Sequence, residues 1–149
     1  MSNNNYSFSK TQKKNLKQLL DTLPRYELAS GSEAFLLGYI AFESVSRMVW
    51  NYYRSVKANK KINETHAPLP LPTIKSAFKA YNIKVSDVVL DTILNSEKKK
   101  RGEKSARNLR NGLVHQWKYE DRKEVLDREH ELIAKLSEVI EVIKNLIDY

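Results

Sequence analysis

The residues of this chain most able to do chemistry lie close together, about three quarters of the way along it. Arg110 carries a permanent charge on a planar guanidinium that fits phosphate oxygens, and His115 has the side chain type that titrates nearest to neutral pH. Asn111 adds a polar group between them, and Leu113 and Val114 are expected to hold this turn against a core. The pattern pairs a phosphate-binding group with a proton-transfer group, although Arg and His at this spacing also occur by chance.

A basic segment comes directly before this motif. Six of the eleven residues from Glu97 to Arg107 are basic, namely Lys98, Lys99, Lys100, Arg101, Lys104 and Arg107. Such a run is most often a solvated loop or helix face, but beside a phosphate-binding motif it is a candidate electrostatic guide for a phosphate chain. The whole chain carries a formal charge of +8, which suits a polyanionic partner or simply solubility.

Two further residues have both a structural and a functional interpretation. Glu43 and Arg47 are one helical turn apart, which predicts a surface ion pair. Alternatively, Glu43 faces the motif and orients one of its side chains. Trp117 follows His115 by two residues and is either a stacking platform for a base or an aromatic of an interface or core.

These residues must be positioned by helices, because composition and patterning favour an all-α protein. The 149 residues are 41% apolar, with only four Gly and four Pro, and suit one helical domain over residues 1–149, whose residues 1–8 are expected to be flexible. There is no Cys, and no apolar run is long enough to span a membrane, so we expect a cytoplasmic protein. His66 has no second His, Cys or carboxylate at ligand spacing, and His130, between Glu129 and Glu131, is expected at the surface or its boundary, so we predict neither a metal site nor a cofactor.

Apolar periodicity predicts the order of the helices. A first helix is expected from about Ser9 to Thr22, and Ser30 with Glu33 forms a capping box that starts a long central helix. The residues expected to face inward from that helix are Ala34, Leu37, Gly38, Ala41, Val45, Met48 and Tyr52, with Phe35, Phe42 and Val49 widening the stripe.

The second half of the bundle follows a Pro-rich segment. Three prolines make residues 59–72 an ordered loop or extended strap, after which two short helices are expected at Thr73–Tyr81 and Ser86–Asn95. A long closing helix is then predicted from Tyr119 or Glu120 almost to the C-terminus, with Val125 and Leu126 among its inward residues.

With this helix order, the string Leu-Arg-Asn-Gly-Leu-Val-His over residues 109–115 resembles the signature of the HEPN (higher eukaryotes and prokaryotes nucleotide-binding) family. Its members are all-α and carry Arg, a polar residue and then His at the junction before a closing helix, a pattern that Arg110, Asn111 and His115 match. The likeness spans roughly residues 30–147.

The resemblance implies a metal-independent endoribonuclease, often the toxin of a toxin–antitoxin pair or a component of phage defence by abortive infection. It also implies a homodimer whose two motifs face one cleft, with an antitoxin or defence-complex protein as a further partner and no membrane contact. In such an enzyme Arg110 would grip phosphate oxygens, His115 would transfer protons and Asn111 would orient His115 or the ribose.

One departure from the family pattern concerns control, and other functions stay open. Some toxins of this family carry a Tyr two residues after the His, where a partner antitoxin attaches AMP, but this chain has Trp117 there and Tyr119 two residues later. The alternative function is a non-catalytic helical module that binds RNA, a nucleotide or a protein. A purely structural bundle is the third possibility.

Overall fold

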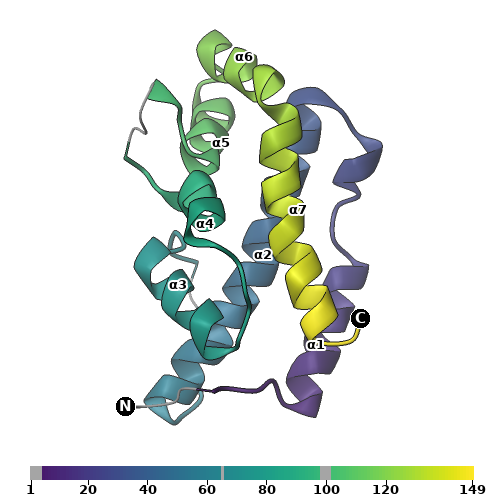
Figure 1. The fold of residues 1–149 in the computed structure, drawn as a ribbon, viewed down its shortest axis with the longest axis vertical. Helices are drawn as coiled ribbons and strands as arrows, with labels where there is room; N and C mark the ends of the chain where they lie inside the picture. Colours follow the sequence, from purple (N-terminus) through teal and green to yellow (C-terminus); the bar gives the residue numbers. More distant parts are fainter. Residues whose placement is uncertain (1–4, 65, 98–101) are drawn as a thin grey trace.

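The computed structural model describes residues 5–64, 66–97 and 102–149, and this part of the chain contains only helices and the segments that join them (Figure 1). In order, the elements are α1 (Lys10–Asp21), the short 3-10 helix η1 (Tyr26–Leu28), α2 (Gly31–Ala58), α3 (Leu71–Ala80), α4 (Asp87–Leu94), α5 (Ala106–His115), α6 (Tyr119–Asp127) and α7 (Glu129–Leu146). The predicted all-α bundle is confirmed. None of the described helices is long and apolar enough to cross a membrane.

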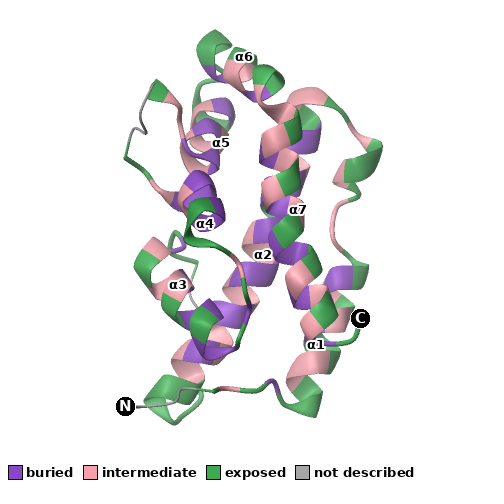
Figure 2. Cartoon of the chain, in the orientation of Figure 1, coloured by how far each residue is buried: buried purple, intermediate pink, exposed green. Residues whose placement is uncertain are grey.

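The long helices α2 and α7 form the centre of the bundle. They lie side by side along its long axis, with α1 on one side and α3, α4 and α5 on the other (Figure 1). Figure 2 shows that buried residues follow the inner sides of both helices. On α2 the buried stripe is centred on Phe35, Phe42 and Val49, whereas the expected Met48 and Tyr52 are only partly buried.

Serine side chains cap three of the helices, but not the central one. Ser9 forms a capping box with Gln12, and the hydroxyls of Ser86 and Ser105 likewise accept a backbone N–H of the first turn. The capping box predicted at Ser30 is wrong, because its side chain makes no capping hydrogen bond. Instead, the N–H of the first helical residue donates to Glu129 Oε1 at 3.1 Å. A carboxylate from α7 therefore stabilises the start of α2.

The predicted single closing helix is broken at Arg128, between α6 and α7. Arg128 has a φ of −113°, and its Nη1 donates to Lys104 O at 2.7 Å and to Glu124 Oε2 at 2.6 Å. The sequence carries a signal of this break, since no apolar residue stands at the turn between Leu126 and Leu132. Leu126, expected to face inward, is 58% exposed.

The Pro-rich segment lies along the bundle as predicted, and we call residues 59–70 the strap. Three arginines donate hydrogen bonds to its carbonyl groups: Arg54 to Asn63 O, Arg47 to Ala67 O and Arg107 to Leu69 O. The Leu69 side chain is buried. Helix α3 starts at Leu71 and so includes Pro72, which is tolerated because first-turn amides have no partner within the helix.

The chain before α1 is packed rather than flexible, as far as the structure describes it. The ring of Phe8 is buried and stacks on Tyr81 with centroids 4.2 Å apart, and the Tyr6 N–H donates to Ala80 O at 2.8 Å. The expectation of a flexible end over residues 1–8 is therefore wrong for these two residues. Aromatic stacking holds them against the end of α3.

Candidate functional site

The Arg–His motif lies within helix α5 rather than in a turn. The helix buries Ala106, Leu109 and Leu113, whereas Val114 is 55% exposed, so the expectation that Val114 packs on the core is wrong. Five residues advance an α-helix by about one turn and a further 140°. Arg110 and His115 consequently project from different sides of α5, which their closeness in the sequence does not reveal.

Arg110 is held on the side of α5 that faces α2. Its Nη1 donates to Asn111 Oδ1 at 3.0 Å, and its guanidinium carbon lies 6.0 Å from the centre of the Tyr39 ring. The Arg110 side chain is partly buried and Tyr39 is 2% exposed. Asn111 thus positions Arg110 in this structure, whereas the resemblance implied a contact with His115 or the ribose.

Tyr39 was not singled out in the sequence, yet it brings α2 into the site. Burial raises the pKa of its hydroxyl, the charge of Glu43 raises that pKa further, and the charges of Arg107 and Arg110 lower it. All three charged residues therefore lie near Tyr39. The available signal was that Tyr39 precedes Glu43 by one helical turn on the same face of α2.

Glu43 makes the predicted ion pair, with a carboxylate oxygen 3.6 Å from Arg47 Nη2. Its influence on Tyr39 also places it on the side of α2 that faces the motif. In the part of the chain that the structure describes, however, no hydrogen bond or ion pair joins Glu43 to Arg110 or His115. The Glu43 carboxylate therefore lies near Tyr39 but does not hold the Arg110 side chain.

His115 is exposed at the end of α5, where the chain turns sharply. Trp117 has a φ of +51°, and its N–H donates to Gly112 O at 2.9 Å, which ends the helix. The Trp117 ring is 51% exposed, so it is not a core residue. The guanidinium carbon of Arg122 lies 5.4 Å from that ring and 5.8 Å from the Tyr119 ring. An exposed aromatic pair thus stands next to His115.

Gly112 lets α5 and α6 approach closely. A Cβ atom at this position would lie 1.9 Å from Asp121 Oδ2. Asp121 is buried, and its Oδ1 accepts from Lys104 Nζ at 2.6 Å. This packing role was not predicted, because a glycine inside a helical pattern does not identify the residue that approaches it.

Of the predicted basic RNA-binding residues, the two that the structure describes are engaged by neighbouring groups. Lys104 is paired with Asp121, and Arg107 donates to the strap. Lys98, Lys99, Lys100 and Arg101 lie outside the described residues. Within the described residues, no group of three His, Asp or Glu side chains could hold a metal ion, and His66 and His130 are both exposed.

Comparison of the chain with protein-family models, with curated proteins and with solved structures found no match.

Proposed function

We propose that the protein is a metal-independent endoribonuclease of the HEPN type, with Arg110 and His115 as its reacting groups. The observation that supports this proposal is that one of the two side chains is held in place and the other is exposed. The Arg110 guanidinium is held by Asn111 and Tyr39, while His115 is exposed to incoming ligands at the end of the same helix. A fixed cation and an accessible imidazole are the two kinds of group that cleavage of a phosphodiester needs.

The proposed reaction is transesterification within the RNA. The ribose 2′-oxygen forms a bond to the adjacent phosphorus as its proton passes to a base, and the bond from phosphorus to the 5′-oxygen breaks as that oxygen receives a proton from an acid. Arg110 stabilises the extra negative charge on the non-bridging oxygens. The products are a 2′,3′-cyclic phosphate and a 5′-hydroxyl, and DNA is not cut because it lacks the nucleophile.

The geometry favours a homodimer for this reaction. One imidazole cannot be base and acid at the same instant, so a cleft shared by two protomers would supply the second His115. Val114, Trp117 and Tyr119 are 55%, 51% and 65% exposed around the motif, an apolar surface that a second copy would cover. As a toxin or phage-defence component, such a dimer would need a restraining partner protein.

A non-catalytic RNA-binding module is the second candidate. It is favoured by the positions of Arg110 and His115 on different sides of α5, which give a single protomer no joint grip on one phosphate. Such a module would bind RNA in a salt-dependent way and leave the strand intact.

The deciding experiment is incubation of the purified protein with a mixed-sequence RNA in EDTA, followed by mapping of the fragment ends. We expect cyclic-phosphate ends from the native protein. Arg110→Ala and His115→Ala should each lower the rate by roughly 10²- to 10⁴-fold. Arg25→Ala and His130→Ala, at exposed positions on other elements, are the matched controls and should leave the rate unchanged. Intact RNA with the native protein would refute the nuclease and leave the binding module.

Mixing tests the shared cleft separately. If both His115 side chains of a dimer are needed, replacing half of the protein by the His115→Ala variant at constant total concentration leaves about one quarter of the activity, because only native pairs are active. Protomers that act alone would keep about half. A linear fall of activity with the native fraction would therefore contradict the shared cleft while leaving the nuclease intact.

A further inference from the structure

The excess positive charge of this protein is not where the motif is. Residues 1–86 contain 13 Lys and Arg against 5 Asp and Glu, an excess of 8, whereas residues 87–149 contain 13 of each kind. The half that carries Arg110 and His115 is therefore neutral overall. The whole net charge of +8 belongs to the half with α1, α2, the strap and α3.

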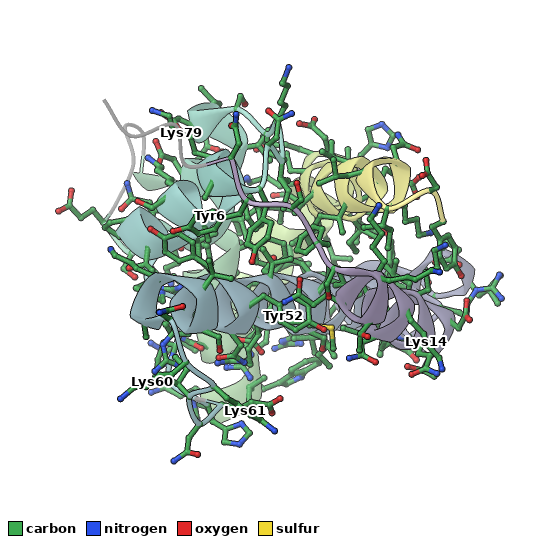
Figure 3. The ribbon with its side chains drawn as sticks, turned by 90° about the horizontal axis from the view of Figure 1, so that it is seen from below. Tyr6, Lys14, Tyr52, Lys60, Lys61 and Lys79 are labelled. Atoms are coloured by element: carbon green, nitrogen blue, oxygen red, sulfur yellow. The ribbon has the colours of Figure 1, made fainter. Side chains whose placement is uncertain are left out.

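Exposed lysines of this half gather at the end of the bundle away from α6. Lys10 and Lys14 stand one turn apart on α1, and Lys60 and Lys61 follow the end of α2. Figure 3 looks onto this end and shows Tyr52 between Lys14 on one side and Lys60 and Lys61 on the other. None of the ion pairs in the described part of the chain involves these four lysines.

A pocket of about 380 Å³ opens between α1, α2 and the strap, and the Tyr52 side chain lines it. Its other polar groups are the amides of Asn15 and Asn51, the hydroxyl of Ser44, the carboxylate of Glu64, and the Glu43–Arg47 ion pair. Burial raises the pKa of the half-buried Tyr52, and a hydrogen bond from Asn15 lowers it. Amide and carboxylate groups beside an aromatic ring suit the edge and the face of a base, whereas Glu64 disfavours a phosphate inside the pocket.

We propose that this lysine end is a second RNA-binding surface, on which Lys10, Lys14, Lys60 and Lys61 hold the backbone of a single strand while one unstacked base enters the pocket at Tyr52. The four lysines lie apart from Arg110 and His115, and the pocket at Tyr52 shares only Glu43 with the candidate site. Only the choice of RNA over another single-stranded nucleic acid rests on the proposed function. The surface would hold a substrate whose cleavage site lies elsewhere on the protein, which the neutral half cannot attract by net charge.

Charge and apolar exposure favour a nucleic acid over an anionic membrane. A membrane-surface helix presents large apolar residues beside its basic ones. The apolar residues of α1 face the core instead, with Leu16 and Leu20 buried. Few large apolar residues are exposed near these lysines. Among the described residues of α1, α2 and the strap, only Val56 is both strongly exposed and near the end of α2.

The test measures the binding of a single-stranded RNA of mixed sequence to protein carrying His115→Ala, so that cleavage cannot interfere. Four phosphate contacts contribute about 0.7 each to the slope of log affinity against log salt for a single strand. Replacing Lys10, Lys14, Lys60 and Lys61 by Gln should therefore lower that slope by about 2.8. Between 50 and 200 mM salt both proteins lose affinity. The fold-loss of the parent would then be about fifty times the fold-loss of the four-lysine variant.

A matched control removes the same charge elsewhere. Lys75, Lys123, Lys135 and Lys144 each pair with a carboxylate, and their replacement by Gln should leave the salt slope nearly unchanged. Equal slopes for the two quadruple variants would overturn the proposal, because net charge alone would then explain binding. Binding to vesicles rich in phosphatidylserine that needs the four lysines, without RNA binding, would also overturn it.

The pocket is tested by Tyr52→Leu, which keeps an apolar side chain against the neighbouring Phe8 ring. Loss of one stacked base should weaken RNA binding roughly five- to hundredfold while leaving the salt slope unchanged. Unchanged affinity would overturn the base-binding part. A smaller salt slope of RNA binding in the four-lysine variant would support the surface even if the native protein leaves RNA intact in EDTA. The binding surface and the nuclease can therefore fail independently.

Discussion

Replacing Gly112 by Ala tests the close approach of α5 and α6. The new Cβ would lie 1.9 Å from Asp121 Oδ2, so the carboxylate must retreat by about 1.5 Å to reach ordinary contact distance. Asp121 is 1% exposed and holds Lys104 Nζ at 2.6 Å, so the movement weakens a largely buried ion pair. We expect a cost of about 2–3 kcal/mol, reduced because Lys104 is one-third exposed.

The opposing effect is the helix propensity of Ala, which gains about 0.5–1 kcal/mol over Gly. The net result should be a loss of about 1–2 kcal/mol in the free energy of unfolding, or roughly 2–8 °C in Tm for a domain of this size. Urea titration followed by circular dichroism at 222 nm measures it. The matched control is Gly38→Ala on α2, whose Cβ would meet its nearest neighbour at 3.4 Å, an ordinary contact, and should be neutral or stabilising.

Repeating Gly112→Ala in an Asp121→Ala variant tests whether the Asp121 carboxylate causes the loss of stability. Asp121→Ala removes the carboxylate atoms that the new Cβ meets. In that background Gly112→Ala should become neutral or stabilising by up to about 1 kcal/mol. If Gly112→Ala stabilises the native protein, or destabilises both backgrounds equally, the close approach of Asp121 does not explain the glycine.

Three further changes probe other parts of the fold. Glu129→Ala should cost about 1 kcal/mol in urea titration because it uncaps α2, whereas Ser30→Ala should cost almost nothing; a reversed order would refute the assigned cap. Arg107→Gln should speed limited proteolysis of the strap and cost about 1–2 kcal/mol; unchanged proteolysis would show that its carbonyl contact is dispensable. Burial raises the pKa of Tyr81 to about 12, so the unfolded chain releases this proton first and stability falls as the pH rises from 10 to 12. Tyr81→Phe should lose this component and be no less stable at pH 7, since the buried hydroxyl has no hydrogen-bond partner in the described structure; an identical alkaline profile would contradict it.

The helix order could be predicted because most element starts carry local signals. Ser9 and Ser86 act through atoms within one turn of themselves, and the sequence contains all that such a cap needs. The start of α2 differs, because Glu129 reaches it from 98 positions away in the chain. A local pattern at Ser30 therefore predicted the right boundary for the wrong physical reason.

The candidate site was predictable as a set of residue types but not as an arrangement. Arg110, Asn111 and His115 identify a short string, yet only the helical path of α5 separates the two charged side chains. Likewise, the basic segment suggested a surface for RNA, but Asp121 neutralises Lys104 from the next helix. Long-range partners of this kind leave no mark in the spacing of the residues they bind.

The arrangement on α5 constrains what a ligand of this site must touch. Arg110 is on the packed side of the helix and His115 is exposed at its end, so a ligand that contacts both must pass around the last turn. Trp117 and Tyr119 stand at that turn with about half or more of their surface exposed, and Arg122 lies against both rings. A molecule that contacts Arg110 and His115 of one protomer would therefore have to extend around this last turn, near which the two rings are exposed.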